Sequence, residues 1–296
     1  EAPPDSLPAL DIVVDALELR GKKWGRVEVE AINTRANATP APNAPAASEW
    51  QVKKFNITLP EGSFKSNGRW LAAREGVALR KTEMNFVLDT QNAGQLLARL
   101  GTPDALRGGT GQLEGVISWQ GSPLTLHVPS MNGHFEVRMG QGQFLKADAG
   151  AAKLLGVLSL QALPRRLLLD FRDVFAQGFA FDSVQGDVTI VHGMANTRNL
   201  QIKGVNALVL LDGSADIAQE NQKLRVQILP IVDTGTASLL AGLAVNPLVG
   251  LTTFVAQWLL QNPLARASAQ EFLVDGSWQA PRVTRVEPRS STTMRP

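Results

Sequence analysis

Apolar and polar residues alternate along most of this chain, with the period of two that is typical of β-strands lying between an apolar and a polar face. Glycine, proline and polar turns separate these segments about every eight to twelve residues, as in an antiparallel meander. We expect strands at residues 11–20, 25–32, 50–59, 62–73, 77–90, 111–120, 124–129, 133–139, 179–191, 195–202, 207–217, 223–229 and 271–278.

Similar short segments recur where three of these strands are expected to end. Trp70 closes the segment NGRW, while Trp119 and Trp278 lie in copies of Ser-Trp-Gln. This weak internal repeat indicates hairpin units stacked in one long sheet.

Four segments depart from the alternation. Residues 92–100 predict a short helix closed by Gly101, and residues 145–163 repeat apolar positions near helical spacing. Residues 34–48 are rich in Ala, Pro and Asn and predict a flexible loop. Residues 281–296 are expected to form a disordered tail.

The fifth departure is the most apolar stretch of the chain, residues 234–265, which contains no Asp, Glu, Lys, Arg or His. Asn246-Pro247 and Asn262-Pro263 divide it, so we expect a pair of helices over residues 236–261, about 15 and about 22 Å long. Neither is long enough to cross about 30 Å of hydrocarbon. The pair either belongs to an ordinary core or contacts lipid, and in the second case the contact residues are Leu239, Leu240, Leu243, Leu248, Leu251, Phe254, Val255, Trp258 and Leu259.

Composition narrows the possible functions. The chain has 296 residues, no cysteine and a net charge of +2. The arginine-rich tail alone carries more positive charge than this total, so the remainder is slightly negative. The nearly neutral remainder argues against a nucleic-acid partner, which needs a basic surface on the folded body. Because the sequence opens at Glu1 without a signal segment, we expect a processed chain or a fragment.

The search for catalytic chemistry finds very little. His127 and His134 flank a turn and could face each other, but two imidazoles without a third ligand make a poor metal site. The glycine-rich segment at residues 108–115 lacks the Lys-Ser/Thr ending of a phosphate loop, and neither GxSxG nor HExxH occurs. We therefore predict no catalytic residues, no metal and no cofactor.

The strand pattern itself suggests a binding surface. If few helices cover an antiparallel sheet that curls, its apolar face becomes a trough that can hold a lipid tail, whose sixteen carbons cost about 13 kcal/mol to expose to water. The residues expected to line the trough are Ile12, Val14, Val188, Ile190, Leu208 and Leu210.

One part of the chain resembles a known family. Residues 144–204, which begin FLKADAGAAKLLG, are similar to the AsmA-like C-terminal region. Residues 229–264 and the terminal VDGSWQAPRV resemble the end of the YhdP proteins of Gram-negative bacteria. The resemblance implies a periplasmic protein, anchored in the inner membrane, whose groove-like β repeats move phospholipid between the inner and outer membranes without catalysis.

These observations predict a mainly β protein with a few α-helices, built as a long curled antiparallel sheet with amphipathic and apolar helices near the C-terminus. Residues 1–143 would form a β repeat region and residues 144–280 the AsmA-like region. Two hypotheses stay open for the function. One is a lipid conduit whose apolar helix pair docks at the outer membrane, and the other is an envelope scaffold that binds a periplasmic or outer-membrane protein.

Overall fold

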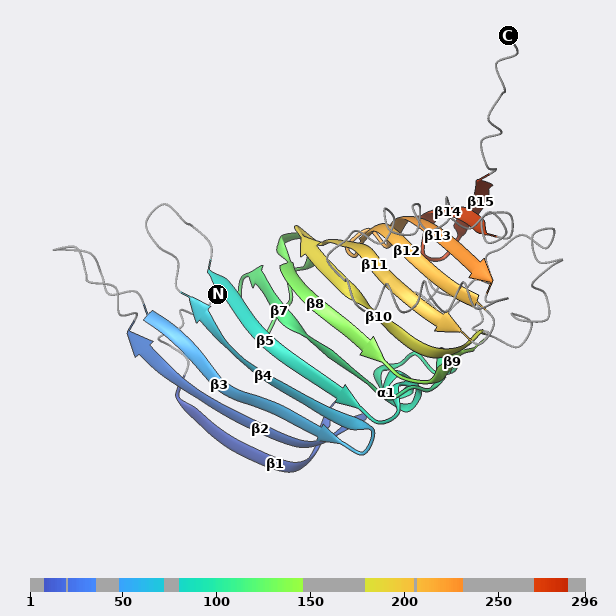
Figure 1. Ribbon diagram of the computed structural model, residues 1–296. Helices are drawn as coiled ribbons and strands as arrows, with labels where there is room; N and C mark the ends of the chain where they lie inside the picture. Colours follow the sequence, from blue (N-terminus) through green and yellow to red (C-terminus); the bar gives the residue numbers. More distant parts are fainter. Residues whose placement is uncertain are drawn as a thin grey trace, which may run out of the picture.

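The described chain is organised as one antiparallel sheet. The computed structural model describes residues 8–19, 21–35, 48–71, 80–145, 179–204, 207–230 and 269–286. Figure 1 shows the strands side by side along the length of the molecule. The expectation of a mainly β protein with a long antiparallel sheet is therefore confirmed.

The sheet contains fifteen strands. Those of the first half are β1 (Leu10–Leu19), β2 (Lys22–Arg35), β3 (Ser48–Leu59), β4 (Gly62–Leu71), β5 (Lys81–Thr90), β6 (Leu106–Gly108), β7 (Gly111–Gln120), β8 (Asn132–Met139) and β9 (Gly142–Phe144). Those of the second half are β10 (Phe179–Val191), β11 (Met194–Gly204), β12 (Ala207–Asp216), β13 (Asn221–Pro230), β14 (Gln270–Ser277) and β15 (Pro281–Val286). The described helices are α1 (Ala93–Leu100) and the 3-10 helix η2 (Val128–Ser130).

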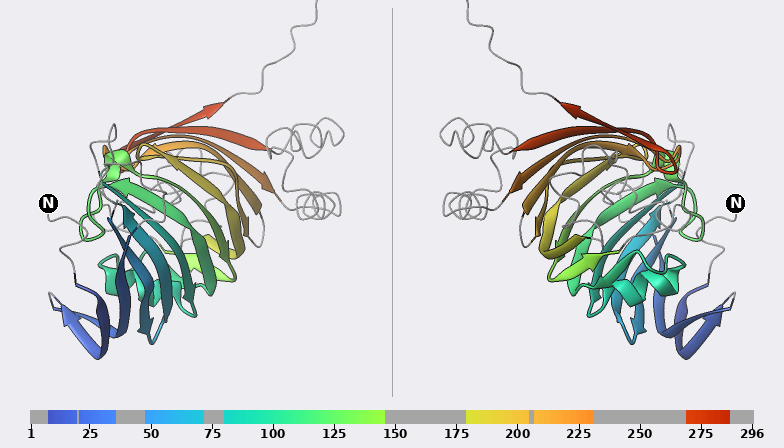
Figure 2. Two further views of the ribbon diagram at one scale, coloured as in Figure 1. Left: turned by 90° about the vertical axis from the view of Figure 1, so that its left-hand side faces the viewer. Right: turned by 90° about the vertical axis from the view of Figure 1, so that its right-hand side faces the viewer.

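Neighbouring strands follow the chain in a simple meander. The order is β1-β2-β3-β4-β5-β7-β8-β10-β11-β12-β13-β14-β15, while β6 pairs with β9 and β9 pairs with β10. This path has two ends, so the described sheet is open, and Figure 2 shows it curling around one side. With about 4.8 Å between strands, the twelve steps of the path give a length of about 58 Å.

The alternating strand directions produce two long rims. One rim consists of the strand ends at Lys22, Leu59, Gly62, Thr90 and Gly111, and it carries α1, so we call it the helix rim. The other consists of the opposite strand ends, from the start of β3 and the end of β4 to the start of β13 and the end of β14.

Helix α1 forms where its capping residues predict it. The side chain of Asn92 accepts a hydrogen bond from the Gln95 amide at 3.1 Å, and Gly101 ends the helix with φ of 107°. A left-handed C-terminal residue is readily adopted by glycine. The buried side chains of Ala93 and Leu96 hold the helix against the sheet.

The connection between β10 and β11 shows how local chemistry sets strand register. It consists of His192 and Gly193, with φ of 49° and 77°. Two consecutive left-handed residues match the twist of a two-residue hairpin, and glycine adopts this conformation at no steric cost.

Among the described residues, one buried cluster lies towards each end of the sheet. The larger joins α1, β6 and β9 to strands β10–β14 and includes Phe144, Phe181 and Phe272. The smaller gathers Ala31, Trp50, Val52 and Trp70 on β2–β4.

Three expectations from the sequence need correction. Residues 281–286, expected in a disordered tail, form β15, because Val283 pairs with Val274 and packs on the larger cluster. Residues 124–129, expected to be a strand, form an irregular connection that leads into η2, which has a proline in its first turn. The short strands β6 and β9 were not expected, since three-residue segments carry too little periodicity to detect.

Several expected features lie wholly or mostly outside the described residues. They are the helix at residues 145–163, the apolar helix pair at residues 236–261 and the central part of the loop at residues 34–48, of which residues 34, 35 and 48 belong to β2 and β3. The sheet continues across the predicted boundary between residues 143 and 144, because β9 spans it.

Candidate functional site

The register of the strands assembles one continuous apolar surface. Residues directly opposite each other on neighbouring strands share a face of the sheet, so the pairing can be followed from strand to strand. One such row contains Val27, Ile57, Phe64, Leu88, Leu113 and Val137. A second contains Val29, Phe55, Ser66, Phe86, Gly115, Phe135 and Val188. On the later strands this face carries Val184, Ile202, Val209, Ile228, Leu211, Val226 and Phe272.

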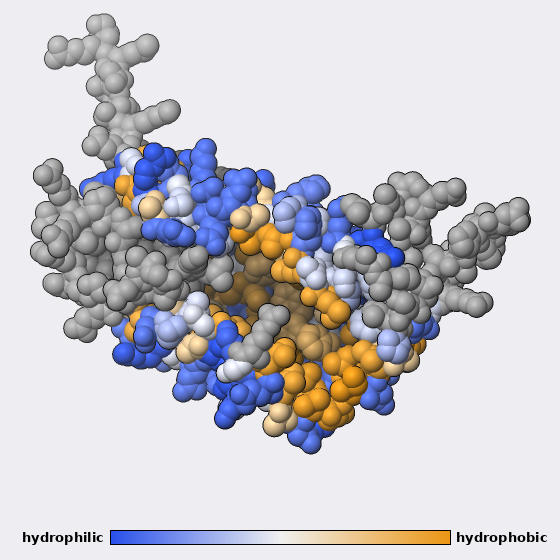
Figure 3. Space-filling view, turned by 180° about the vertical axis from the view of Figure 1, so that it is seen from behind, coloured by the Kyte–Doolittle hydropathy of each residue, from blue (hydrophilic) through white to orange (hydrophobic). Residues whose placement is uncertain are grey.

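We call this surface the apolar face. Figure 3 views the molecule from behind and shows a hollow whose visible lining is hydrophobic, between hydrophilic borders. The apolar face of the described strands therefore lies inside the curl of the sheet.

Burial changes along the apolar face. On β12, β13 and β14, Val209, Val226 and Phe272 are at most 2% exposed. On β3, β4, β5, β7 and β8 the corresponding side chains are only half-buried. They include Phe55, Ile57, Phe64, Phe86, Leu88, Leu113, Phe135 and Val137. The first half of the sheet thus presents an apolar surface that the protein's own side chains only partly cover.

Phenylalanine rings form the centre of this half-buried part. The centroid of Phe64 lies 5.9 Å from that of Phe55 and 6.3 Å from that of Phe86. Gly115 follows Phe86 in the same row, and a Cβ atom there would lie 2.5 Å from the Cβ of Phe135. Because Gly115 has no side chain, the surface is lower between the rings of Phe86 and Phe135.

The opposite face of the sheet, which we call the polar face, carries ion pairs on many strands, although Leu208, Leu210 and Leu229 are buried on the same side of β12 and β13. Lys54 lies 2.7 Å from Glu28, Arg69 lies 2.7 Å from Glu83, and Arg225 lies 3.2 Å from Glu271. The hydrogen bond from Lys54, followed by that from Arg26, holds the pKa of Glu28 below its ordinary value. These exposed pairs keep this face in contact with water.

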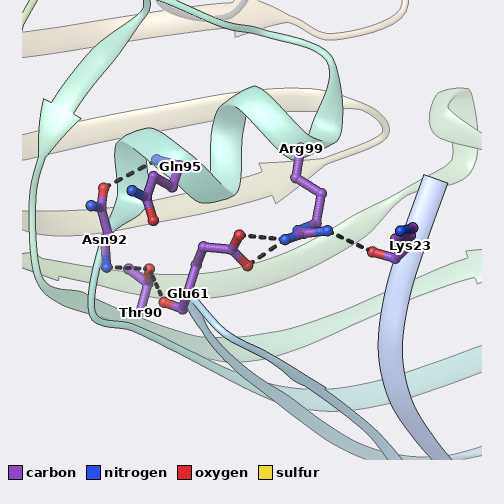
Figure 4. A network of polar contacts seen from close by, with 6 residues as sticks. All are labelled: Lys23, Glu61, Thr90, Asn92, Gln95 and Arg99. Carbon is purple, nitrogen blue, oxygen red and sulfur yellow. Dashed lines mark hydrogen bonds and ion pairs between the residues drawn. The ribbon is translucent and has the colours of Figure 1, made fainter. Parts of the chain in front are cut away.

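A partly buried polar network lies at the helix rim (Figure 4). Arg99 donates two hydrogen bonds to the carboxylate of Glu61, and a third to the carbonyl oxygen of Lys23 at 2.8 Å. The hydroxyl of Thr90 donates to the carbonyl of Glu61 at 2.9 Å. Glu61 is 8% exposed, and the hydrogen bond from Arg99 lowers the pKa of its carboxyl.

Tryptophans mark the other rim, which we call the tryptophan rim. Trp50, Trp70 and Trp119 belong to one cross-strand row that also includes Thr82, and Trp278 lies at the end of β14 on the same rim. All four are at most 9% exposed. This rim therefore borders the apolar face with indole rings.

The structure places four of the six predicted lining residues on the apolar face, two on β1 and two on β10. Ile12 and Val14 of β1 pair with Val29 and Val27, and Val188 pairs with Phe135, so all lie on the apolar face. Ile190 reaches the same face opposite Gly133. Their contact with lipid stays a prediction.

The other two lining predictions are wrong about the face. Leu208 and Leu210 pair with Lys203 and Gln201 of β11, on the polar side of the sheet, whereas Val209 and Leu211 point to the apolar face. The run from Ala207 to Leu211 is buried on both faces, so its sequence has no alternation that distinguishes the two sides.

The nine residues predicted to contact a membrane, from Leu239 to Leu259, lie outside the described residues. The described strands on either side of them, β13 and β14, end and begin at the helix rim. Within the described ranges, no helix has the length and apolarity needed to cross a membrane.

No metal-binding constellation is present among the described residues, where no three His, Cys, Asp or Glu side chains converge. His127 and His134 do not face each other: His127 contacts the Ser130 hydroxyl at 2.8 Å, and His134 lies beside Thr189 and Asp187.

Sequence reasoning missed the phenylalanine centre and the tryptophan rim. The signal for the rim was available, because Trp70 closes the segment NGRW and Trp119 and Trp278 lie in copies of Ser-Trp-Gln, each near the end of a strand. The phenylalanines needed the register between strands, which a single sequence does not specify.

Comparison with known proteins identifies relatives of the chain. The sequence profile of the family described as YhdP protein matches residues 1–283. The chain is 29% identical over 171 residues to the intermembrane phospholipid transporter YhdP of Escherichia coli strain K12. The aligned part covers 57% of this chain and 13% of that protein, so the chain spans only a small part of this relative. No solved structure matches the chain.

Proposed function

The chain belongs to the YhdP protein family, a family with a phospholipid transporter among its members, and on that premise we propose that its apolar face holds the acyl chains of phospholipids in transit between two membranes. The chain would act by sheltering lipid from water, without catalysis or a cofactor. Full transport would belong to the longer protein of which this chain represents a part.

The main observation that supports this proposal is the half-buried apolar surface of β3, β4, β5, β7 and β8. A hydrocarbon tail laid on Phe64, Phe86 and Leu113 would bury its own surface and the exposed remainder of those side chains. Each methylene removed from water contributes about 0.8 kcal/mol, so a tail gains stability in proportion to the length that the face covers.

The dimensions of the face also support a lipid ligand. On β4 the distance from Gly62 to Trp70 is about 26 Å at about 3.3 Å per residue. One leaflet of a bilayer contains about 15 Å of hydrocarbon, half of a core of about 30 Å. An acyl chain therefore fits across the face between the two rims.

We further propose the location and docking of the longer protein. A phospholipid carrier between two membranes works in the periplasm, with an inner-membrane anchor elsewhere in the protein. The apolar helix pair at residues 236–261 would dock at the outer membrane through Leu251, Phe254 and their neighbours. Leu251→Asp and Phe254→Asp should weaken liposome binding, because a carboxylate opposes insertion into hydrocarbon.

The main experiment compares two adjacent residues of β5 that face opposite sides. Phe86 lies on the apolar face and Val87 on the polar face, opposite Lys65 and Glu114. Native mass spectrometry of the purified chain should detect bound phospholipid in the wild type and in Val87→Lys. Phe86→Lys should lose most of it, because an ammonium group would lie in the path of the tails.

Two results would contradict the proposal. One is a wild-type chain that carries no lipid after exposure to phospholipid vesicles. The other is equal lipid loss in the two folded variants, since a charge on the polar face does not touch the tails. A photo-crosslinker at Leu113 that captured polypeptide and no lipid would favour a protein-binding scaffold instead.

A further inference from the structure

The unpartnered polar atoms of the described residues are gathered on the apolar face. Five buried side-chain atoms have no hydrogen-bond partner there, and they belong to Ser66, Trp70, Thr197, Gln222 and Trp278. The strand register places Ser66, Trp70, Thr197 and Gln222 on the face that carries Val209 and Phe272, and Trp278 directly follows the last residue of β14. Buried polar groups without a partner are rare in native proteins, and each one calls for an explanation.

Three of the five belong to the tryptophan rim. Trp70 is 2% exposed, Gln222 5% and Trp278 9%. Gln222 is the second residue of β13 and lies beside the end of β14, where the backbone N–H of Trp278 donates to the carbonyl of Glu220 at 2.8 Å. An indole N–H donor and an amide oxygen acceptor are thus left unused at the same end of this rim.

The tryptophan rim also carries a cation against an indole ring. The guanidinium carbon of Arg80 lies 5.4 Å from the centroid of Trp70. Guanidinium groups bind phosphate strongly, and indole rings favour the boundary between hydrocarbon and water. These groups suit the polar end of a phospholipid.

The helix rim has the opposite character. Its inner side is an apolar core that includes Ala93, Leu106, Phe144 and Phe181. Its buried carboxylate, Glu61, is already paired with Arg99. A polar headgroup would find no unused partner among these residues, whereas the end of an acyl chain would meet hydrocarbon.

We propose that a bound phospholipid lies across the strands, with its phosphate and glycerol at the tryptophan rim and its acyl chains directed towards the helix rim. This orientation rests on the proposed function, and it means that headgroups pass from strand to strand along one rim. Lipids at different positions along this rim would meet different groups. Arg80, beside Trp70, would meet the phosphate oxygens of a lipid on β4 and β5. Seven strands further along the path, the Trp278 N–H would meet a phosphate oxygen, and the Gln222 carbonyl would accept from a hydroxyl or ammonium group of the headgroup.

The absence of cysteine makes the orientation directly measurable. Leu124, 83% exposed, lies between β7 and β8 at the tryptophan rim, and Leu100, 45% exposed, ends α1 at the helix rim. Leu124→Cys and Leu100→Cys would each carry a fluorophore. Each protein is then loaded with phosphatidylcholine that bears a nitroxide either on the headgroup or near the end of an acyl chain.

We expect the headgroup nitroxide to quench the fluorophore at position 124 at least twofold more than the one at position 100, and the acyl nitroxide to give the reverse. Equal quenching by the two lipids, or the opposite pattern, would overturn the orientation while leaving lipid binding intact. No quenching at either position by either lipid would instead overturn the proposed function.

A pair of tryptophan variants tests the polar contacts. Trp278→Phe removes an unpartnered N–H, whereas Trp119→Phe removes an N–H that donates to the Ser122 carbonyl at 3.0 Å. Trp278→Phe should retain several-fold less phosphatidylglycerol than Trp119→Phe, with equal retention of palmitic acid, which has no phosphate. Trp119→Phe should show the larger fall in thermal midpoint. Equal phosphatidylglycerol retention by the two variants would contradict a headgroup contact at Trp278.

Discussion

Arg99 connects three segments that lie far apart in the sequence. Its guanidinium bonds to Glu61 in the turn between β3 and β4, and to the carbonyl of Lys23 at the start of β2. Lys22 adds a hydrogen bond to the carbonyl of Leu100 at 2.9 Å, where the dipole of α1 favours a cation. One side chain therefore helps to hold the first hairpin against α1.

The charge of this pair should make its contribution pH-dependent. The Arg99 hydrogen bond lowers the pKa of Glu61 in the folded state, so the unfolded chain takes up the proton first as the pH falls. The stabilisation is complete above the ordinary carboxyl pKa, about 4.3, and is lost as the pH falls through the lower folded value. Arg99→Met should cost about 1–3 kcal/mol at pH 7, the cost of leaving a buried polar group unpaired.

Thermal unfolding of the wild type and Arg99→Met between pH 7 and pH 3 checks this expectation. The difference between their midpoints should shrink towards pH 3. Arg138→Met is the control, because Arg138 pairs with Glu136 on the exposed polar face and should change the midpoint little at any pH. A difference that stays constant with pH would indicate that Arg99 acts through packing alone.

Sequence reasoning reached some residues of the site and not others. Alternation placed Ile12, Val14, Val188 and Ile190 on the apolar face, because each lies in a strand with one polar side. It failed at Leu208, where five consecutive buried residues remove the distinction between faces. It also gave no hint of Arg99, since an ion pair between residues 61 and 99 depends on the turn and the helix meeting in space.

At the scale of elements, two neighbouring residues of β15 allow a test of what holds this last strand against the sheet. Val283 packs on the larger cluster, while Thr284, its neighbour, points to the other face opposite Leu273. Val283→Asp should lower the free energy of unfolding by about 1–3 kcal/mol, because it places a carboxylate against an apolar core. Thr284→Asp should change it by less than about 0.5 kcal/mol, as is usual at surface positions.

Urea denaturation of the two variants measures the difference. If both lose the same stability, β15 contributes to the protein through its backbone pairing with β14 and not through Val283. The strand was not apparent from the sequence, because Arg282 and Arg285 make this segment as polar as a disordered tail. In the folded protein Arg282 donates a hydrogen bond to Asp275 at 2.8 Å, a contact that the sequence does not reveal.

Helix α1 is expected to brace the first hairpin of the sheet. Lys22→Ala together with Arg99→Ala removes both hydrogen bonds that tie β2 to the helix. Amide hydrogen exchange in β1 and β2 should then accelerate, while exchange in β11 and β12 stays unchanged, because opening free energies are set by local contacts. Faster exchange throughout the sheet would mean that the variant lowers global stability instead.

At the scale of the whole molecule, the sequence predicted the class of fold well and its assembly only partly. Alternation and turn spacing gave the antiparallel meander, since each strand reports its own two-sided environment. The alignment of those faces into one surface depends on register, and several strands shift register at bulges, for example between Val52 and Phe55. Whether helices would cover the apolar face was left open by the sequence, because that coverage depends on tertiary packing.

The open curl predicts how affinity should vary with ligand size. If the apolar face holds acyl chains, lysophospholipids of one headgroup should bind more tightly as the chain lengthens, by up to about 0.8 kcal/mol per methylene. Extending the chain from twelve to sixteen carbons should then improve affinity by up to about 200-fold, at about 1.4 kcal/mol per factor of ten. The trend should continue through these lengths, because the face is about 26 Å wide on β4 and a chain of this size spans about 15 Å.

Competition of each lysophospholipid against a fluorescent fatty acid gives the affinities, measured below the concentration at which the lipids form micelles. Phe86→Lys should reduce the slope per methylene, because its ammonium group interrupts the apolar row, and Val87→Lys should keep the wild-type slope. Affinity that did not depend on chain length would mean that only the headgroup is recognised. The hollow of the sheet would then be a consequence of its curvature and not the surface on which lipid travels.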